Sequence, residues 1–350
     1  MQTERLRQLK SSIAGILFIL ICGVAHSQEV CGIDSIFYNG FETTGPALNT
    51  YPGALHSPGT ATSIDGGTLS VSITSPSSGS TVDGSTVEVV GTYAGPTDIG
   101  ITVNGAVAYV QNGTFVAPAV PVVSGSNSLM ATAAKLSGTT ASSAAVSISG
   151  SGNAPAITLG APRLLGLAPF TVGFTPNIGT LPAGRTVSSV AIDYNGDGID
   201  DYTGPSFSGA TLSYTFTAPG VYKARFRATD NMSTVYTVFR SVVIQDVAVQ
   251  RGMLCDVYGY MRQNLIANDT IDAALALQTD IRAPFQSVWS SFGSNLPAAA
   301  QALGIIADGL LLGNSAQFTL IRKRASDGKT SGHPLLFSMG ADGLWRIDSM

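Results

Sequence analysis

Apolar and polar residues alternate along residues 68 to 150, and turn residues interrupt the alternation about every 8 to 12 positions. Strict alternation places every second side chain on the same face of a strand, so one face can be buried while the other meets water. Asn104-Gly105 and Asn112-Gly113 each separate two apolar runs, and Asn-Gly favours a two-residue hairpin because both residues tolerate positive φ. The pattern predicts an antiparallel β-sandwich over residues 68 to 150.

Residues 154 to 247 show the same alternation and predict a second β-sandwich. Along residues 222 to 228, small and aromatic side chains alternate with those of Lys223, Arg225 and Arg227, as in a half-buried strand. The three basic side chains are open to two interpretations. They form either a face that attracts an acidic polymer or, more commonly, a solubilising face that protects a sheet edge.

The period changes from two residues to helical spacing after residue 247. Apolar residues at 253, 258, 261 and 265 recur at helical intervals, and Asp269 is suited to cap a second helix. Residues 283 to 292 and 297 to 303 predict further helical turns, and alternation returns after Gly304, with a hairpin turn at 340 to 343. Helices followed by strands predict an α+β domain over residues 248 to 350. The predicted fold class is therefore mainly β, with two tandem Ig-like β-sandwiches followed by a domain of helices and then an antiparallel sheet.

Residues 73 to 92 read ITSPSSGSTVDGSTVEVVGT, residues 101 to 120 read ITVNGAVAYVQNGTFVAPAV, and residues 125 to 134 read GSNSLMATAA. In this order the three motifs resemble the bacterial Ig-like domains of the glucodextranase-B type. The resemblance covers the whole first sandwich segment and implies an Ig-like β-sandwich there.

Residues 214 to 222 read YTFTAPGVY and are followed by ATD at 228 to 230. This combination resembles the PKD family of Ig-like sandwiches. Where PKD domains carry an earlier W-D-F-G-D-G motif, residues 192 to 198 read IDYNGDG, so Ile192 replaces Trp and one residue is inserted. The resemblance implies a divergent PKD domain. The ending FSMGADGLWRID, residues 337 to 348, is similar to the last hairpin of NTF2-like and cystatin-like folds.

The first 27 residues carry the three parts of a secretory signal peptide. A basic region precedes the apolar stretch Ile13 to Val24, and Ala25-His26-Ser27 forms a cleavage site before Gln28. The apolar stretch is shorter than the roughly 20 residues that span a bilayer, and no later stretch is long and apolar enough, so no transmembrane anchor is predicted. Residues 28 to 67, rich in Gly, Pro, Ser and Thr, predict a flexible segment, and SGSGNAP at 149 to 155 predicts a linker between the sandwiches. We expect an exported protein that is extracellular, cell-surface or periplasmic.

Charged residues make up 11% of the chain, and its formal net charge is −4. This balance argues against a nucleic-acid partner, because nucleic-acid binding needs a basic patch. Cleavage of the signal peptide would leave Cys31 and Cys255. In an oxidising compartment these two can pair, or Cys255 can remain a small buried hydrophobe. After cleavage the only histidines would be His56 and His333, and two cysteines with two histidines so far apart in the sequence argue against a Cys/His zinc site.

The densest group of acidic residues lies in the sequence DYNGDGIDD at 193 to 201. Calcium takes six to eight oxygen ligands on a tightly curved loop, and acidic or amide side chains at alternate positions suit it. The residue at the twelfth position is Gly and not the bidentate Glu of an EF-hand, so the pattern predicts a weak, structural calcium site. The alternative is an ordinary polar hairpin turn. The candidate ligands are Asp193, Asn195, Asp197, the carbonyl of Ile199, and Asp201.

The sequence contains no G-x-S-x-G, H-E-x-x-H or G-x-x-x-x-G-K-[ST] motif, and His333 precedes Pro334 in what reads as a polar hairpin. We therefore expect a non-catalytic secreted or cell-surface protein whose Ig-like and PKD modules are spacers for binding an extracellular polysaccharide or protein. One alternative is a structural component of the envelope. Another is an enzyme or small-ligand binder with its site in the C-terminal domain, where aromatic residues are either pocket lining or plain core. These aromatic residues are Tyr258, Tyr260, Phe285, Trp289, Phe318 and Trp345.

Overall fold

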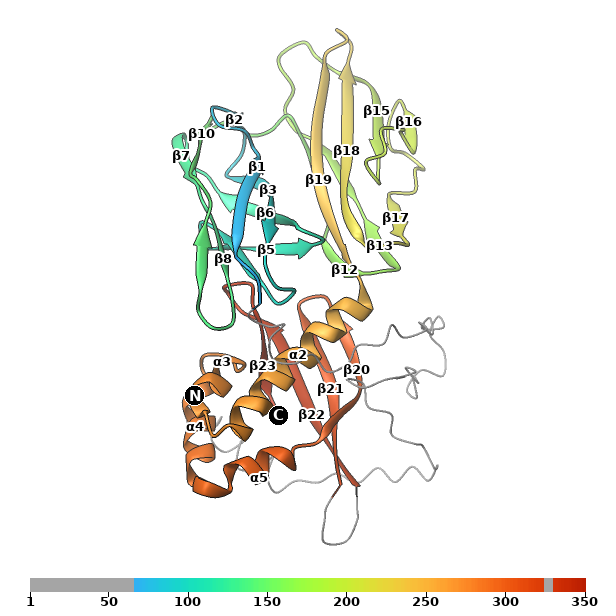
Figure 1. The fold of residues 1–350 in the computed structure, drawn as a ribbon. Helices are drawn as coiled ribbons and strands as arrows, with labels where there is room; N and C mark the ends of the chain where they lie inside the picture. The colour runs from blue at the N-terminus through green and yellow to red at the C-terminus, as the bar shows by residue number, and fades with distance from the viewer. Residues whose placement is uncertain (1–65, 324–329) are drawn as a thin grey trace, which may run out of the picture.

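The computed structural model of the chain describes residues 66–323 and 330–350. These residues form two β-sandwiches followed by an α+β domain, which confirms the predicted fold class (Figure 1). The predicted signal peptide (1–27) and nearly all of the predicted flexible segment (28–67) lie outside the described residues. Within the described part of the chain, no helix combines the length and the apolar character that crossing a membrane requires.

The first sandwich packs two sheets around one apolar core, which includes the fully buried side chains of Val89, Ile101 and Phe115. Its strands are β1 (Ser70–Ser75), β2 (Thr81–Val82), β3 (Thr86–Ala94), β4 (Gly100–Val103), β5 (Ala106–Gln111), β6 (Thr114–Pro121), β7 (Gly125–Leu129), β8 (Ala131–Ala134), β9 (Thr140–Ser142) and β10 (Val146–Gly150). One sheet has the order β1-β3-β6-β5-β4-β8-β9, and the other has the order β2-β10-β7. Asn104 and Asn112 both have a φ of 47°, so the predicted β4–β5 and β5–β6 hairpin turns are confirmed.

The second sandwich has its own sheets and its own core. Its strands are β11 (Ile157–Gly160), β12 (Leu165–Leu167), β13 (Phe170–Gly173), β14 (Thr175–Ile178), β15 (Val187–Asp193), β16 (Tyr202–Gly204), β17 (Ser213–Phe216), β18 (Gly220–Asp230) and β19 (Val235–Gln245). The main sheet has the order β12-β19-β18-β15-β16, and the pairs β11-β14 and β13-β17 complete the sandwich. Ala224, Phe226 and Ala228 are fully buried on β18, which confirms the predicted alternation of that strand.

The C-terminal domain packs helices on one antiparallel sheet of order β20-β21-β22-β23. Asp269 caps α3, because its side chain accepts hydrogen bonds from the amides of Ile271 and Asp272, both at 3.0 Å, as the sequence predicted. The elements are α2 (Val247–Ile266), α3 (Thr270–Leu275), α4 (Arg282–Ser291), a 3₁₀ turn (Gly293–Asn295), α5 (Leu296–Gln301), β20 (Ile305–Leu312), β21 (Ser315–Lys323), β22 (Thr330–Met339) and β23 (Trp345–Ser349). Cys255 on α2 is disulfide-bonded, and the other cysteines of the chain lie outside the described residues.

His333 lies on a strand and not in the hairpin loop that the sequence suggested. Strand β22 already begins at Thr330, and His333 pairs with Leu320 of β21. Strand β23 pairs with β22 from Leu336 onward, so Pro334 occupies a stretch with a strand on one side, where a missing amide donor is tolerated.

The two sandwiches pack side by side along β19 (Figure 1). The carboxylate of Glu88 on β3 accepts hydrogen bonds from the amide nitrogen of Ser241, at 2.9 Å, and from its Oγ, at 2.6 Å. Val243 of β19 is fully buried against Val116 of the first sandwich, whereas its neighbours Val242 and Ile244 point into the core of the second. The end of β19 is therefore buried on both faces.

The C-terminal domain is held against both sandwiches. One residue, Asp246, separates β19 from α2, and its side chain caps the helix by accepting from the amide of Ala248 at 2.7 Å. The β22–β23 turn lies directly against β4, because a Cβ built on Gly100 would fall 2.4 Å from the carbonyl oxygen of Asp342. Leu136 of the first sandwich also belongs to the core of the C-terminal domain. The three domains thus meet at one junction.

Candidate functional site

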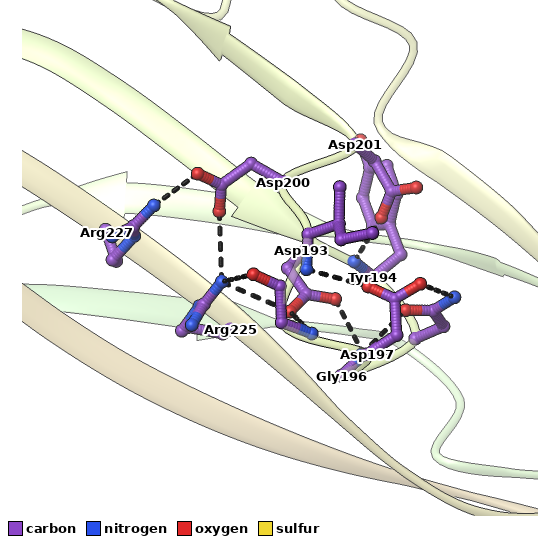
Figure 2. A network of polar contacts seen from close by, with 11 residues as sticks. Asp193, Tyr194, Gly196, Asp197, Asp200, Asp201, Arg225 and Arg227 are labelled. Atoms are coloured by element: carbon purple, nitrogen blue, oxygen red, sulfur yellow. Dashed lines mark hydrogen bonds and ion pairs between the residues drawn. The ribbon is translucent and has the colours of Figure 1, made fainter.

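The predicted calcium ligands lie at the end of β15, which Asp193 terminates, and on the loop that joins β15 to β16 (Figure 2). The Asp193 side chain is 1% exposed, and its two oxygens accept hydrogen bonds from the amides of Gly196, at 2.7 Å, and Gly198, at 3.0 Å. Gly196 and Gly198 have φ values of 76° and 92°, a region that glycine enters without steric penalty. The local sequence therefore folds the loop around the Asp193 carboxylate.

Asp197 and Asp201 also accept hydrogen bonds from within this segment. Asp197 accepts from the amide of Ile199 at 2.8 Å and from the side chain of Asn195 at 3.0 Å, and these bonds lower its pKa in that order. Asp201 accepts from the amide of Tyr194 at 2.6 Å. The bond from the Ile199 amide to Asp197 has the spacing of an Asx turn, in which a short polar side chain satisfies the backbone amide two residues on.

Two arginines of β18 supply positive charge to this loop (Figure 2). Arg225 Nη2 lies 3.3 Å from Oδ2 of Asp193 and 3.2 Å from Oδ1 of Asp200, and Arg227 also pairs with Asp200. The antiparallel register places Asp193 directly opposite Arg225, which brings the two side chains together. The basic face noted in the sequence is thus largely paired within the domain, and Lys223 stacks over Phe239 at 4.4 Å from the ring centroid.

The five predicted ligands lie within nine residues of one another. The side-chain oxygens of Asp193, Asn195 and Asp197, and Oδ2 of Asp201, already accept hydrogen bonds or form ion pairs. Across residues 66–323 and 330–350, no group of three or more His, Cys, Asp or Glu side chains is arranged to hold a metal ion. Calcium would have to displace amide and guanidinium partners of these carboxylates. Calcium binding therefore stays a prediction, and a titration is its test.

Calcium binding at this loop predicts a small gain in stability. At tenfold excess over a dissociation constant of about 10⁻⁴ to 10⁻³ M, the gain is about 1.4 kcal/mol, or a few degrees in Tm. Calorimetry of the protein with and without millimolar calcium measures it, and Asp197→Ala should remove the gain. Equal melting temperatures with and without calcium would contradict calcium binding. The positive charges that balance the acidic loop would then be those of Arg225 and Arg227.

Most of the aromatic side chains considered as a pocket lining in the C-terminal domain belong to its core. The Tyr258 hydroxyl donates to the carbonyl of Gly304 at 2.6 Å, and burial raises the pKa of Tyr258 to about 12. Phe285 packs on Trp289 with ring centroids 5.8 Å apart. Phe318 makes an edge contact with Phe337, and Tyr260 is buried in the same core. Trp345, which is also buried in this core, borders a cavity as well.

That cavity lies at the junction of the three domains and has a volume of about 270 Å³. Burial raises the pKa of Tyr93, and a hydrogen bond from the Gly113 amide opposes the shift, so this phenol stays neutral at physiological pH. Within the described part of the chain, all three domains contribute side chains to the wall. These include Tyr93 and Gln111 from the first sandwich, Gln245 and Gln250 from β19 and α2, and Met339 and Trp345 from the last hairpin.

Two glutamines of this wall are almost fully buried. Gln245 is 4% exposed and Gln250 is 6% exposed. Gln245 donates from Nε2 to the carbonyl of Val110 at 3.3 Å, while its Oε1 and the Nε2 of Gln250 have no hydrogen-bond partner among the described residues. Buried amide atoms normally find partners, so two unpaired ones at one cavity mark it as a candidate binding site.

The sequence interpretation did not find this junction. A signal was present in the run SVVIQ at 241 to 245, which interrupts the alternation of the preceding residues. A continuous apolar run on a strand indicates burial on both faces, and hence a second layer against the sandwich.

His333, the other candidate for chemistry, is exposed on β22. Its Nε2 lies 3.2 Å from the Oγ of Ser331. In the described residues no carboxylate hydrogen-bonds the imidazole, so the pair lacks the third group that orients a catalytic histidine.

Comparison with known proteins reveals only distant similarity. No family model matches the chain, and no curated protein matches it. Among solved structures, it is similar to the fibronectin(III)-like modules of Clostridium thermocellum CbhA, with 13% identity over 51% of this chain and 95% of that one, and a TM-score of 0.21. It is also similar to Bacteroides ovatus SGBP-B, solved in complex with a mixed-linkage heptasaccharide, with 11% identity over 50% and 45% of the two chains and a TM-score of 0.17. Drosophila N-cadherin matches at 14% identity over 51% and 68%, with a TM-score of 0.17. At these values the assignment of fold rests on the strand topology described above.

Proposed function

We propose that this chain is an exported, non-catalytic binding protein whose two β-sandwiches hold the C-terminal α+β domain in a fixed position. The observation that carries the proposal is the cavity that all three domains line. Ligand sites occur preferentially at domain interfaces, where a few polar groups are set in an apolar wall. Domains that act only as spacers would not require a cavity lined by polar groups from all three domains.

The remaining parts of the proposal come from the sequence. The signal-peptide pattern supports export, and the motifs support a first domain of the glucodextranase-B Ig-like type, a divergent PKD domain and an NTF2-like or cystatin-like third domain. Because PKD and Ig-like modules commonly serve extracellular binding, the proposed partner class is an extracellular polysaccharide or protein. Because this inference rests on family resemblance, it concerns the class of partner only.

A pull-down on insoluble material tests the proposed function. We expect the purified protein to be depleted from solution by at least one insoluble extracellular polysaccharide and to release no soluble sugar from it. Retention on envelope fractions without any polysaccharide would favour a structural envelope component. Release of soluble product would indicate an enzyme, and retention on none of these materials would contradict the proposal.

A further inference from the structure

We infer that the junction cavity binds one uncharged sugar residue, either free or at the end of a chain. This inference rests on the proposed binding function and names the chemistry of its ligand. It follows from the charge, the hydrogen-bonding groups and the size of the cavity.

The charge of the wall favours a neutral ligand. Among the described residues that line the cavity there is no Lys, Arg or His to pair with an anion. Its one carboxylate, that of Asp246, caps α2 through Oδ1, which lies 2.7 Å from the amide of Ala248 and 3.2 Å from that of Val249. A cationic ligand would share this single carboxylate with the helix cap, and an anionic ligand would lack a counter-charge.

The polar groups of the wall suit a hydroxyl-bearing ligand. Oε1 of Gln245 is an acceptor and Nε2 of Gln250 is a donor, and neither has a hydrogen-bond partner within the described residues. A hydroxyl group both donates and accepts, so vicinal hydroxyls can satisfy the two amides together. Both atoms are covered in the structure, while both glutamines line the cavity, so a ligand reaches these atoms only after the side-chain torsions change.

The aromatic groups and the volume point to a single ring. Tyr93 and Trp345 line the same cavity and offer flat apolar surfaces for the C–H face of a sugar. A volume of about 270 Å³ lies below the range of roughly 300 to 1,000 Å³ typical of sites for drug-sized ligands. The cavity therefore admits one sugar ring, and any longer chain has to continue outside it.

The test uses the full mature chain and defined probes. Saturation-transfer NMR and tryptophan fluorescence are recorded with the methyl glycosides of glucose, galactose, mannose and N-acetylglucosamine up to tens of millimolar. The chain has two tryptophans, so Trp289→Phe leaves Trp345, at the cavity, as the sole reporter. We expect at least one glycoside to bind and to change the Trp345 emission.

Two variants of the same helix locate the site. Gln250→Leu removes the unpaired Nε2 at nearly constant side-chain volume and should weaken binding about tenfold. Because Nε2 of Gln250 has no hydrogen-bond partner within the described residues, the Tm of the variant should equal or exceed that of the wild type, which separates lost binding from lost folding. Gln263→Leu, at an exposed position of α2, is the matched control and should bind as the wild type does.

Three outcomes would overturn the inference. They are binding of none of the glycosides, equal binding by Gln250→Leu and the wild type, and binding of N-acetylglycinamide, a peptide-like amide, in place of the sugars. Failure here alongside retention on an insoluble polysaccharide would place that binding elsewhere on the protein and leave the proposed function standing. Failure of both experiments would reject the proposed function itself.

Discussion

Replacing Gly100 with alanine should undock the C-terminal domain from the first sandwich. The added Cβ would lie 2.4 Å from the carbonyl oxygen of Asp342 and 2.7 Å from the amide nitrogen of Leu344. Both are backbone atoms, so no side-chain rotation can relieve the clash, and the β22–β23 turn has to move. Overpacking of this kind costs about 1–3 kcal/mol. Calorimetry should show a lower Tm and an earlier, separate transition for the C-terminal domain, with a red-shifted Trp345 emission.

Gly173→Ala is the matched control for this prediction. Gly173 lies on β13 with ordinary φ, and a Cβ added to it would meet no atom within 4 Å, so the substitution should leave the thermogram unchanged. A Gly100→Ala protein that melts as the wild type does, with unchanged emission, would show that the turn does not dock on β4.

Replacing Asp230 with asparagine should strongly destabilise the second sandwich. The Asp230 side chain is fully buried and accepts hydrogen bonds from Arg185 Nη1, at 2.6 Å, and from the amides of Met232 and Thr234, both at 2.9 Å. Burial raises the pKa of Asp230, but these bonds outweigh burial and lower the pKa to about 2. An asparagine keeps the shape of the aspartate side chain, but its NH₂ group would face the hydrogen-bond donors that the carboxylate now accepts from. The negative charge opposite Arg185 would also be lost.

The lowered pKa also predicts a pH dependence. The group has a pKa of 3.8 outside the fold and about 2 within it, so its contribution to stability is complete above pH 3.8 and is lost as the pH falls towards 2. The wild type should lose Tm across this interval, and Asp230→Asn should start several degrees lower and fall less steeply. Parallel curves for the two proteins between pH 5 and 2 would contradict the role of Asp230, and Asp83→Asn, on the first sandwich, controls for general acid effects.

Local patterns predicted the elements well. The turns at Asn104 and Asn112 followed from residues that tolerate positive φ, and the cap at Asp269 followed from a side chain that satisfies the first amides of a helix. Each of these features is decided by a few neighbouring residues. Alternation along β18 likewise predicted its buried face, since the period of a strand is set by the backbone alone.

Features that depend on distant contacts were not predicted. Calcium binding at residues 193 to 201 stays a prediction, but the register of β15 against β18 pairs Arg225 with Asp193 and Asp200, which the sequence did not predict. Carboxylates suited to calcium are also suited to arginine and to backbone amides, so residue type alone does not separate the two. The junction depends on contact between Gly100 and the β22–β23 turn, which lie about 240 residues apart in the sequence. No local sequence pattern predicts a contact over that separation.

The single residue between β19 and α2 has a consequence for how the protein can engage several targets at once. Domains joined by flexible linkers can adjust their spacing, and the effective concentration of a second binding event then varies smoothly with linker length. Here Asp246 is both the only residue between β19 and α2 and the N-cap of α2, so no flexible linker separates the second sandwich from the C-terminal domain. If both carry binding surfaces, avidity will be all or none: a target whose repeat matches the fixed spacing gains the full multivalent enhancement, and one that does not match gains nothing.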